Sequence, residues 1–256
     1  MSDSLDILGV KIAATNLQLT CQSIDRWVKE RHKTYVCIAP VSTIVDCQYD
    51  PEYRKVVNSA GMATPDGMPL VWLARARGYK QVHRTYGPDL MPVVCDFGQT
   101  RGYRHYFYGA NPEALERLES RLKNQFPDVK IVGSFSPGFS KQCQDESPEV
   151  LQEINRLQPD ILWVGLGSPK QDFWMCRHRD KLEVPVMIGV GAAFDFLAGT
   201  KPQAPVWMRG IGLEWFFRLC CEPKRLWKRY LIGNSKFIWY LLQDSLKKSC
   251  GRKYDS

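Results

Sequence analysis

The chain has 256 residues, of which 44% are hydrophobic and 24% charged, a composition typical of a globular protein and not of a disordered one. At this length one α/β domain is sufficient. No basic segment followed by a long apolar one opens the chain, and no apolar stretch approaches the roughly 20 residues that span a bilayer, so neither a secretory signal nor a transmembrane helix is predicted.

The net charge of +8 is concentrated at one end of the chain. Residues 200–256 hold 12 lysines and arginines against 4 aspartates and glutamates, whereas the first 199 residues are balanced. The same segment carries half of the eight tryptophans, namely Trp207, Trp215, Trp227 and Trp239. A basic, aromatic segment on a neutral body predicts an anionic partner surface, either a membrane or a nucleic acid.

The nine cysteines are scattered, odd in number and without a CxxC pair. This favours reduced thiols, as in a cytosol, over a disulfide framework or a zinc site. The four histidines are far apart and no HExxH occurs, so no metal site is predicted.

The first hundred residues predict short elements of mixed type. Expected in order are an edge strand or hairpin arm at 7–13, a helix at 20–31 capped by Thr20, a strand at 35–39 and helices at 41–50 and 52–59. Asp66 is expected to cap a helix within 63–75, with Pro69 in its first turn. Arg84 opens the stretch that begins the next helix, which ends near Phe97.

From Tyr103 onward, apolar runs alternate regularly with amphipathic segments. The pattern predicts a Rossmann-like, doubly wound, mostly parallel sheet from about residue 100 onward. Strands are expected at 103–108, 129–133, 161–164 and 184–190, helices at 113–126, 150–157 and 173–181, and a polar loop at 134–146.

The last part of the chain predicts helices of a different character. A helical segment at 206–221 is interrupted at Glu222-Pro223, and an amphipathic helix at 224–242 follows. We therefore expect an α/β domain over residues 1–204 and a basic helical appendage over 205–256.

Three glycine loops follow predicted strands, at the edge where ligands bind in open α/β sheets. Glycine lets backbone N–H groups approach a phosphate, so these loops suit a nucleoside diphosphate, with polar reach added by Lys170 and Gln171. No loop completes GxGxxG and no GxxxxGK[ST] occurs, which disfavours a Rossmann oxidoreductase and a Walker-type NTPase. The loop glycines are Gly109, Gly165, Gly167, Gly189 and Gly191.

Three charged residues each allow two interpretations. Asp66 could be a general base or a helix cap. Asp195 could bind a ribose or cap a helix, and Arg84 could be a surface cation or a phosphate clamp.

Four motifs, in this order, resemble those of the WecG/TagA/CpsF glycosyltransferases, family 26 of the glycosyltransferases. The resemblance extends from about Ile7 to Tyr240. The motifs are Thr64-Pro-Asp-Gly-Met-Pro-Leu-Val-Trp72, Arg84-Thr-Tyr-Gly-Pro-Asp-Leu90, Val164-Gly-Leu-Gly-Ser-Pro-Lys-Gln171, and Val190-Gly-Ala-Ala-Phe-Asp-Phe-Leu-Ala-Gly199 with Ala204–Arg209, Gly212–Trp215 and Glu222–Arg225 after it.

The resemblance implies a fold of the GT-E type and a metal-independent, inverting transfer that needs no cofactor. The donor is a UDP-sugar carrying N-acetylmannosamine, its uronate, glucose or glucuronate, and the acceptor is a polyprenyl-(di)phosphate-linked saccharide. Family members act peripherally at the cytoplasmic face of the membrane, in cell-wall or exopolysaccharide synthesis. We expect an anionic membrane surface as partner, no nucleic acid, and a possible homo-oligomer.

The resemblance also implies roles for individual residues. Asp66 matches the proposed base, while Arg84 and Gln171 match the other two catalytic positions. The appendage supplies Arg218, Arg225 and a third cation, for which both Lys228 and Arg229 are candidates. Further substrate contacts are expected from Ser42, Thr43, Gly67, Gly87, Gly109, Ala110, Gly165, Gly167, Ser168, Lys170, Gly191 and Asp195.

The chain departs in two places from the pattern of the family that it resembles. Ala39-Pro40-Val41-Ser42-Thr43 stands where many relatives have Thr-x-Asn, and Pro202-Gln203-Ala204-Pro205 replaces their Lys-Arg-Ala-Pro. Two other classes remain open on the residues alone: a non-catalytic protein that binds an anionic membrane or nucleic acid through the basic segment, and a nucleotide-dependent oxidoreductase.

Overall fold

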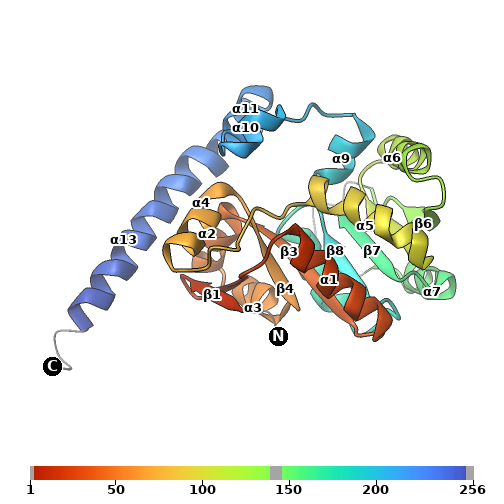
Figure 1. The fold of residues 1–256 in the computed structure, drawn as a ribbon, viewed down its shortest axis with the longest axis horizontal. Helices are drawn as coiled ribbons and strands as arrows, with labels where there is room; N and C mark the ends of the chain where they lie inside the picture. Colours follow the sequence, from red (N-terminus) through yellow and green to blue (C-terminus); the bar gives the residue numbers. More distant parts are fainter. Residues whose placement is uncertain (1–2, 139–145, 252–256) are drawn as a thin grey trace.

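The computed structural model describes residues 3–138 and 146–251 (Figure 1). A small antiparallel hairpin joins β1 (Ser4–Ile7) to β2 (Val10–Ala13). The other six described strands form one sheet, parallel at every neighbouring pair, in the order β4-β3-β8-β7-β5-β6. Of the loop expected at 134–146, residues 139–145 lie outside the described residues. The six strands are β3 (Thr34–Pro40), β4 (Met62–Asp66), β5 (Arg104–Gly109), β6 (Lys130–Phe135), β7 (Ile161–Gly165) and β8 (Val186–Gly189).

Helices cover both faces of the sheet, which confirms the Rossmann-like doubly wound prediction. Alternation along β3 fills both cores, because Val36 and Ile38 belong to one buried cluster while Tyr35 and Cys37 belong to the other. One layer contains α2 (Val41–Tyr49), α3 (Pro51–Ser59), α4 (Met68–Ala76), α7 (Pro148–Leu157) and α8 (Lys170–His178). The other contains α1 (Leu17–Lys29), α5 (Gly87–Arg101), α6 (Pro112–Gln125) and α9 (Ala193–Ala198).

The sheet begins earlier in the chain than the sequence predicts. β3 and β4 belong to it, so the expected start near residue 100 was wrong. The expected cap at Asp66 was also wrong: Asp66 ends strand β4, and Gly67, with φ +138°, precedes α4. Pro65 lies within β4, where it is tolerated because β4 is an edge strand and one side of its backbone needs no partner strand.

Helix boundaries differ from the predicted ones where a better cap is present. Asn16, not Thr20, caps α1 by accepting a hydrogen bond from the backbone N–H of Leu19 at 3.0 Å. Thr20 is buried instead, with its hydroxyl 2.9 Å from that of Thr15. The stretch opened by Arg84 enters α5 only at Gly87.

The described part of the appendage, residues 205–251, is helical, with the predicted break at Glu222-Pro223 and a further break at 211–213 within the segment expected to be one helix. Its longest helix, α13, lies along α2 and extends away from the sheet (Figure 1). Phe237 of α13 is buried in the core, and the hydroxyls of Tyr240 and Tyr49 are 2.6 Å apart. The elements are α10 (Val206–Gly210), α11 (Glu214–Cys221), α12 (Pro223–Trp227), a π-helical turn η1 (Lys228–Ile232) and α13 (Gly233–Gly251).

Within residues 3–138 and 146–251, no helix combines the length and the apolar content that crossing a membrane requires.

Candidate active site

Two cavities meet at the carboxyl ends of the sheet strands and share a wall formed by Asp66, Glu214, Arg218 and Arg229. The larger one, about 330 Å³, lies over the glycine loops, and we call it the loop cavity. The smaller one, about 100 Å³, lies between α4 and the appendage, and we call it the appendage cavity. Asp66 therefore faces two separate spaces.

The loop cavity is lined by the loops after β7 and β8. Gly167 and Gly191 both adopt left-handed backbone conformations, with φ of +79° and +54°. Both glycines line the cavity, as do Leu166 and Ser168 on either side of Gly167. The predicted site residues that line the loop cavity are Asp66, Gly87, Gly167, Ser168, Lys170, Gln171, Gly191, Arg218, Arg225 and Arg229.

Two of the predicted glycines serve packing and do not line either cavity. A Cβ on Gly109 would lie 2.7 Å from the backbone carbonyl carbon of Gly165, and one on Gly165 would lie 2.5 Å from the ring of Phe194. Ala110, next to Gly109, donates its backbone N–H to the Gly165 carbonyl at 3.3 Å and also lies outside both linings.

Gln171 links the loop after β7 to the loop after β8 through hydrogen bonds. Its side chain is buried, and its Oε1 accepts hydrogen bonds from the backbone N–H groups of Gly167 at 3.0 Å and Gly191 at 2.9 Å. Its Nε2 donates to the Ser168 hydroxyl at 3.3 Å. Because both backbone N–H groups already donate to Gln171, they are not available to bind an anion. Other groups that line the cavity must bind it.

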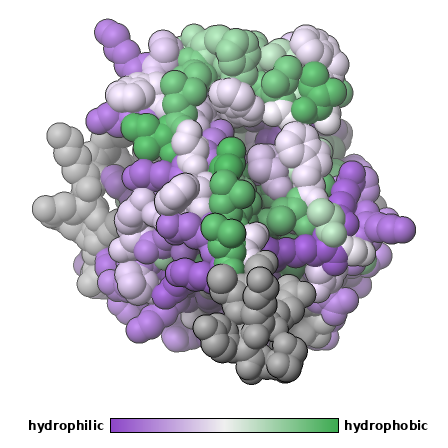
Figure 2. All heavy atoms as spheres, turned by 90° about the vertical axis from the view of Figure 1, so that its left-hand side faces the viewer, coloured by the Kyte–Doolittle hydropathy of each residue, from purple (hydrophilic) through white to green (hydrophobic). Residues whose placement is uncertain are grey.

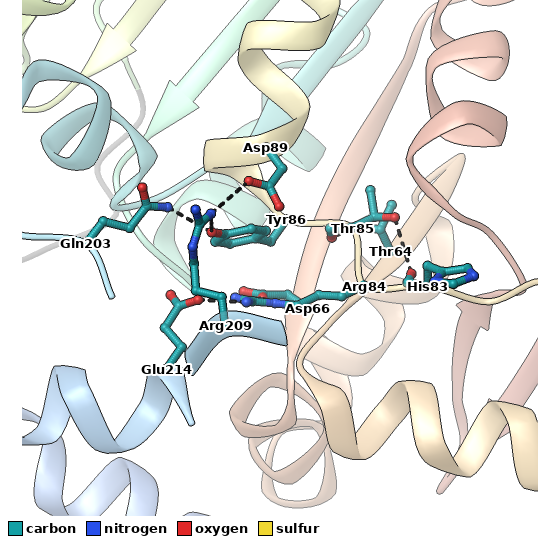
Figure 3. Close-up of polar contacts among 10 residues, drawn as sticks. All are labelled: Thr64, Asp66, His83, Arg84, Thr85, Tyr86, Asp89, Gln203, Arg209 and Glu214. Atoms are coloured by element: carbon teal, nitrogen blue, oxygen red, sulfur yellow. Dashed lines mark hydrogen bonds and ion pairs between the residues drawn. The ribbon is translucent and has the colours of Figure 1, made fainter. Parts of the chain in front are cut away.

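Arg84 joins the end of strand β4 to the appendage (Figure 3). Its Nε and Nη2 donate to Oδ1 of Asp66 at 3.1 and 3.0 Å, and its Nη1 donates to Oε2 of Glu214 at 2.7 Å. Burial lowers the pKa of Arg84, but the two carboxylates outweigh this, so the pKa is raised and the guanidinium remains charged. The sequence allowed Arg84 to be a phosphate clamp; in the structure it is paired with two carboxylates.

A second set of contacts surrounds Tyr86 (Figure 3). The Arg84 guanidinium lies 3.7 Å from the centre of the Tyr86 ring. The Tyr86 hydroxyl accepts from Arg209 Nη1 and from Gln203 Nε2, both at 2.8 Å, and Arg209 also reaches Asp89 at 3.1 Å. Burial raises the pKa of Tyr86 to about 12, so its hydroxyl stays protonated near neutral pH.

The basic residues of the appendage are not equivalent. Arg229 lines both cavities, whereas Lys228 lines neither and holds its ammonium 5.6 Å from the centre of the Trp227 ring. Arg218 lies 5.3 Å from the ring of Phe196, and Arg225 forms an ion pair with Glu222. Between the two candidates for the third cation, only Arg229 is placed at the cavities.

The other predicted contacts divide in the same way. Ser42 and Gly67 line the appendage cavity, but Thr43 is buried and bonds the Tyr53 hydroxyl at 3.4 Å. Asp195 pairs with Lys201 at 2.9 Å and lines neither cavity. The structure thus gathers most of these residues, and leaves Thr43, Gly109, Ala110, Gly165, Asp195 and Lys228 outside.

Sequence reasoning missed several residues of the site. Glu214 is the most prominent, because its carboxylate bonds Arg84 and it lines both cavities. It lies in the Gly212–Trp215 motif, so the pattern contained it without indicating a role. The appendage cavity is also lined by Met68, Trp215, Tyr230 and Asn234.

Among the described residues, no three His, Cys, Asp or Glu side chains gather as ligands of a metal ion. His105 is a core residue: its Nδ1 accepts from Trp163 Nε1 at 3.1 Å, and burial lowers its pKa to about 4.

Comparison with known proteins agrees with the geometry. Residues 5–251 match the family model described as "Glycosyl transferase WecG/TagA/CpsF family". An N-acetylglucosaminyldiphosphoundecaprenol N-acetyl-β-D-mannosaminyltransferase of Bacillus subtilis (strain 168) is 31% identical over 200 residues, 78% of this chain and 76% of that protein. A protein of the same name from Staphylococcus aureus (strain NCTC 8325) is 26% identical over 236 residues, 91% of this chain and 89% of that protein. The chain therefore belongs to the WecG/TagA/CpsF family of glycosyltransferases.

Proposed function

We propose that this glycosyltransferase moves N-acetylmannosamine from a UDP-linked donor to N-acetylglucosaminyldiphosphoundecaprenol, in the synthesis of a cell-surface polysaccharide. The names of the two relatives support the choice of sugar and acceptor. The observation that carries the proposal is the position of Asp66 on the wall shared by the loop cavity and the appendage cavity. A base that removes a proton from one substrate as it attacks another must face both.

The donor occupies the loop cavity in this proposal. Its volume, about 330 Å³, lies within the usual range for small-molecule sites. Arg218, Arg225 and Arg229 line it from the appendage, and guanidinium groups match phosphate oxygens in geometry and charge. They are suited to hold the diphosphate and to stabilise the charge that develops on UDP as it leaves.

The acceptor sugar enters the appendage cavity. This cavity combines aromatic walls, Trp215 and Tyr230, with the polar side chains of Ser42 and Asn234. Such a mixture of apolar walls and a few polar groups is typical of sites that orient a ligand.

In the proposed reaction, Asp66 accepts the proton of the acceptor hydroxyl while the hydroxyl oxygen bonds the anomeric carbon of the donor. The bond between that carbon and the diphosphate oxygen breaks at the same time, and UDP leaves from the opposite face. The anomeric centre is therefore inverted. Arginine side chains supply the positive charge that stabilises the leaving UDP, so the reaction requires no metal ion.

The appendage is proposed to hold the enzyme on the membrane that contains its lipid-linked acceptor, at the cytoplasmic face. Figure 2 shows hydrophobic side chains gathered on the face of the molecule that carries α13. We accordingly treat residues 1–204 as the catalytic domain and 205–256 as a membrane-associating appendage. Its large exposed apolar side chains are Val206, Trp207, Ile211, Leu213, Phe216, Trp227, Leu231, Ile232, Ile238, Trp239, Leu242 and Leu246.

The function is tested by incubating the purified full chain with a panel of UDP-sugars and N-acetylglucosaminyldiphosphoundecaprenol, with and without EDTA. We expect a new glycolipid with UDP-N-acetylmannosamine, an inverted linkage by NMR, and turnover that EDTA does not change. Transfer from a different UDP-sugar would overturn the choice of sugar. Absence of transfer with every donor would overturn the acceptor or the activity.

A further inference from the structure

Glu214 is a buried carboxylate that belongs to the appendage but bonds to the sheet domain. It begins α11, its side chain is 8% exposed, and its Oε2 accepts from Arg84 Nη1 at 2.7 Å. A buried charge is stable only when a partner is held firmly against it. The contact bridges residues 130 positions apart in the sequence.

The same guanidinium group holds Asp66 by its other edge. Nε and Nη2 of Arg84 both bond Oδ1 of Asp66, and the ring of Tyr86 supports the guanidinium 3.7 Å away. Because a guanidinium is planar and rigid, fixing Nη1 on Glu214 also fixes the edge that carries Asp66. Figure 3 shows the three side chains in this arrangement.

We propose, on the basis of the function proposed above, that Glu214 is a positioning residue: it acts through Arg84 to orient Asp66, and so makes the base competent only when the appendage is docked. The appendage also carries Arg218 and Arg229, which line the loop cavity. Glu214 and Arg218 lie on the same helix, α11, so one element holds both the residue that orients the base and one of these cations.

The test measures kcat and KM for UDP-N-acetylmannosamine in the full-length Glu214→Gln variant, which keeps the size of the side chain and removes its charge. We expect kcat to fall about 10- to 100-fold, as for a small misplacement of a reacting group, while KM for the donor changes less than about threefold. Glu153→Gln, which removes the carboxylate of an exposed pair with Arg156, is the matched control and should leave both values unchanged. An unchanged kcat in Glu214→Gln, or a rise in KM alone, overturns the proposal.

Two further variants separate positioning from folding. Glu214→Asp keeps the charge but withdraws the carboxylate by one methylene, so kcat should fall about tenfold at unchanged KM; wild-type kcat contradicts the proposal. In an Arg84→Ala background, Glu214→Gln should cost less than about twofold in kcat, because its route to Asp66 is already gone. Additive losses would show that Glu214 acts by another path.

Asp66→Asn is measured in parallel to keep the two proposals apart. Loss of turnover in Asp66→Asn together with full kcat in Glu214→Gln overturns only the role of Glu214. Full turnover in Asp66→Asn overturns the assignment of the base, and with it the role of Glu214.

Discussion

At the scale of single residues, Asp66 owes its position to the strand that it ends. β4 pairs with β3 up to Asp66 itself, which places the carboxylate at the carboxyl edge of the sheet. Both hydrogen bonds from Arg84 reach the same oxygen, Oδ1. The Asp66 side chain is 23% exposed, so it contributes little to the packing of the core.

We therefore expect Asp66→Asn to fold normally and to lose turnover by more than about a hundredfold, because the amide cannot accept the acceptor's proton. Steady-state transfer and thermal unfolding of the same preparation check both parts. Asp180→Asn is the matched control, since Asp180 also bonds an arginine, Arg179 at 3.0 Å, but at the surface. Near wild-type turnover in Asp66→Asn would refute the base.

At the scale of elements, α13 decides whether the appendage stays on the body. It contacts α2, and Phe237 enters the same buried cluster as Val41 and Ile44. The next residue on the helix, Ile238, is 59% exposed. Phe237 therefore anchors the helix to the body, whereas its neighbour Ile238 belongs to the outer surface.

Phe237→Ala should reduce the free energy of unfolding by about 3–5 kcal/mol and also lower kcat, because the undocked appendage withdraws Arg218 and Arg229. Ile238→Ala, the control, should leave the free energy of unfolding unchanged, because Ile238 is exposed. Chemical denaturation and transfer assays of both variants make the comparison. Equal stability of the two variants would mean that α13 is not docked in solution.

At the scale of the whole molecule, the basic charge and the exposed apolar surface are concentrated in the same part of the chain. The excess of basic residues lies in 200–256, and most of the large exposed apolar side chains lie there too. Electrostatic attraction to anionic headgroups and insertion of exposed apolar side chains act together at a membrane surface.

We expect the protein to sediment with phosphatidylglycerol vesicles, to bind phosphatidylcholine vesicles less, and to be released progressively as salt rises. Replacing Trp239 and Leu246 by Gln should weaken binding severalfold, since each removes an exposed apolar side chain. Leu19→Gln, an exposed leucine on α1 outside the appendage, is the control. Equal binding by all three proteins, or tighter binding to an oligonucleotide than to the vesicles, would contradict a membrane role.

The sequence by itself determined the doubly wound architecture, the break at Pro223, the loop at 165–171 and the family. These follow from patterns within a few residues: buried runs, glycines after strands, and proline where a helix cannot continue. It predicted no strand at residues 62–66, because Thr-Pro-Asp-Gly is also a pattern that starts helices, and only the position of β4 at the sheet edge tolerates Pro65 within a strand.

Only the tertiary structure decided which charges meet. Local pattern left Arg84 as a surface cation or a clamp, and the family resemblance left open whether Lys228 or Arg229 reaches the phosphate. In the fold, Arg84 bonds Asp66 and Glu214, and Arg229 reaches both cavities while Lys228 reaches neither. Partners of this kind are far apart in the chain, so their pairing depends on how α11 and η1 are carried back over the sheet, which no short stretch of sequence specifies.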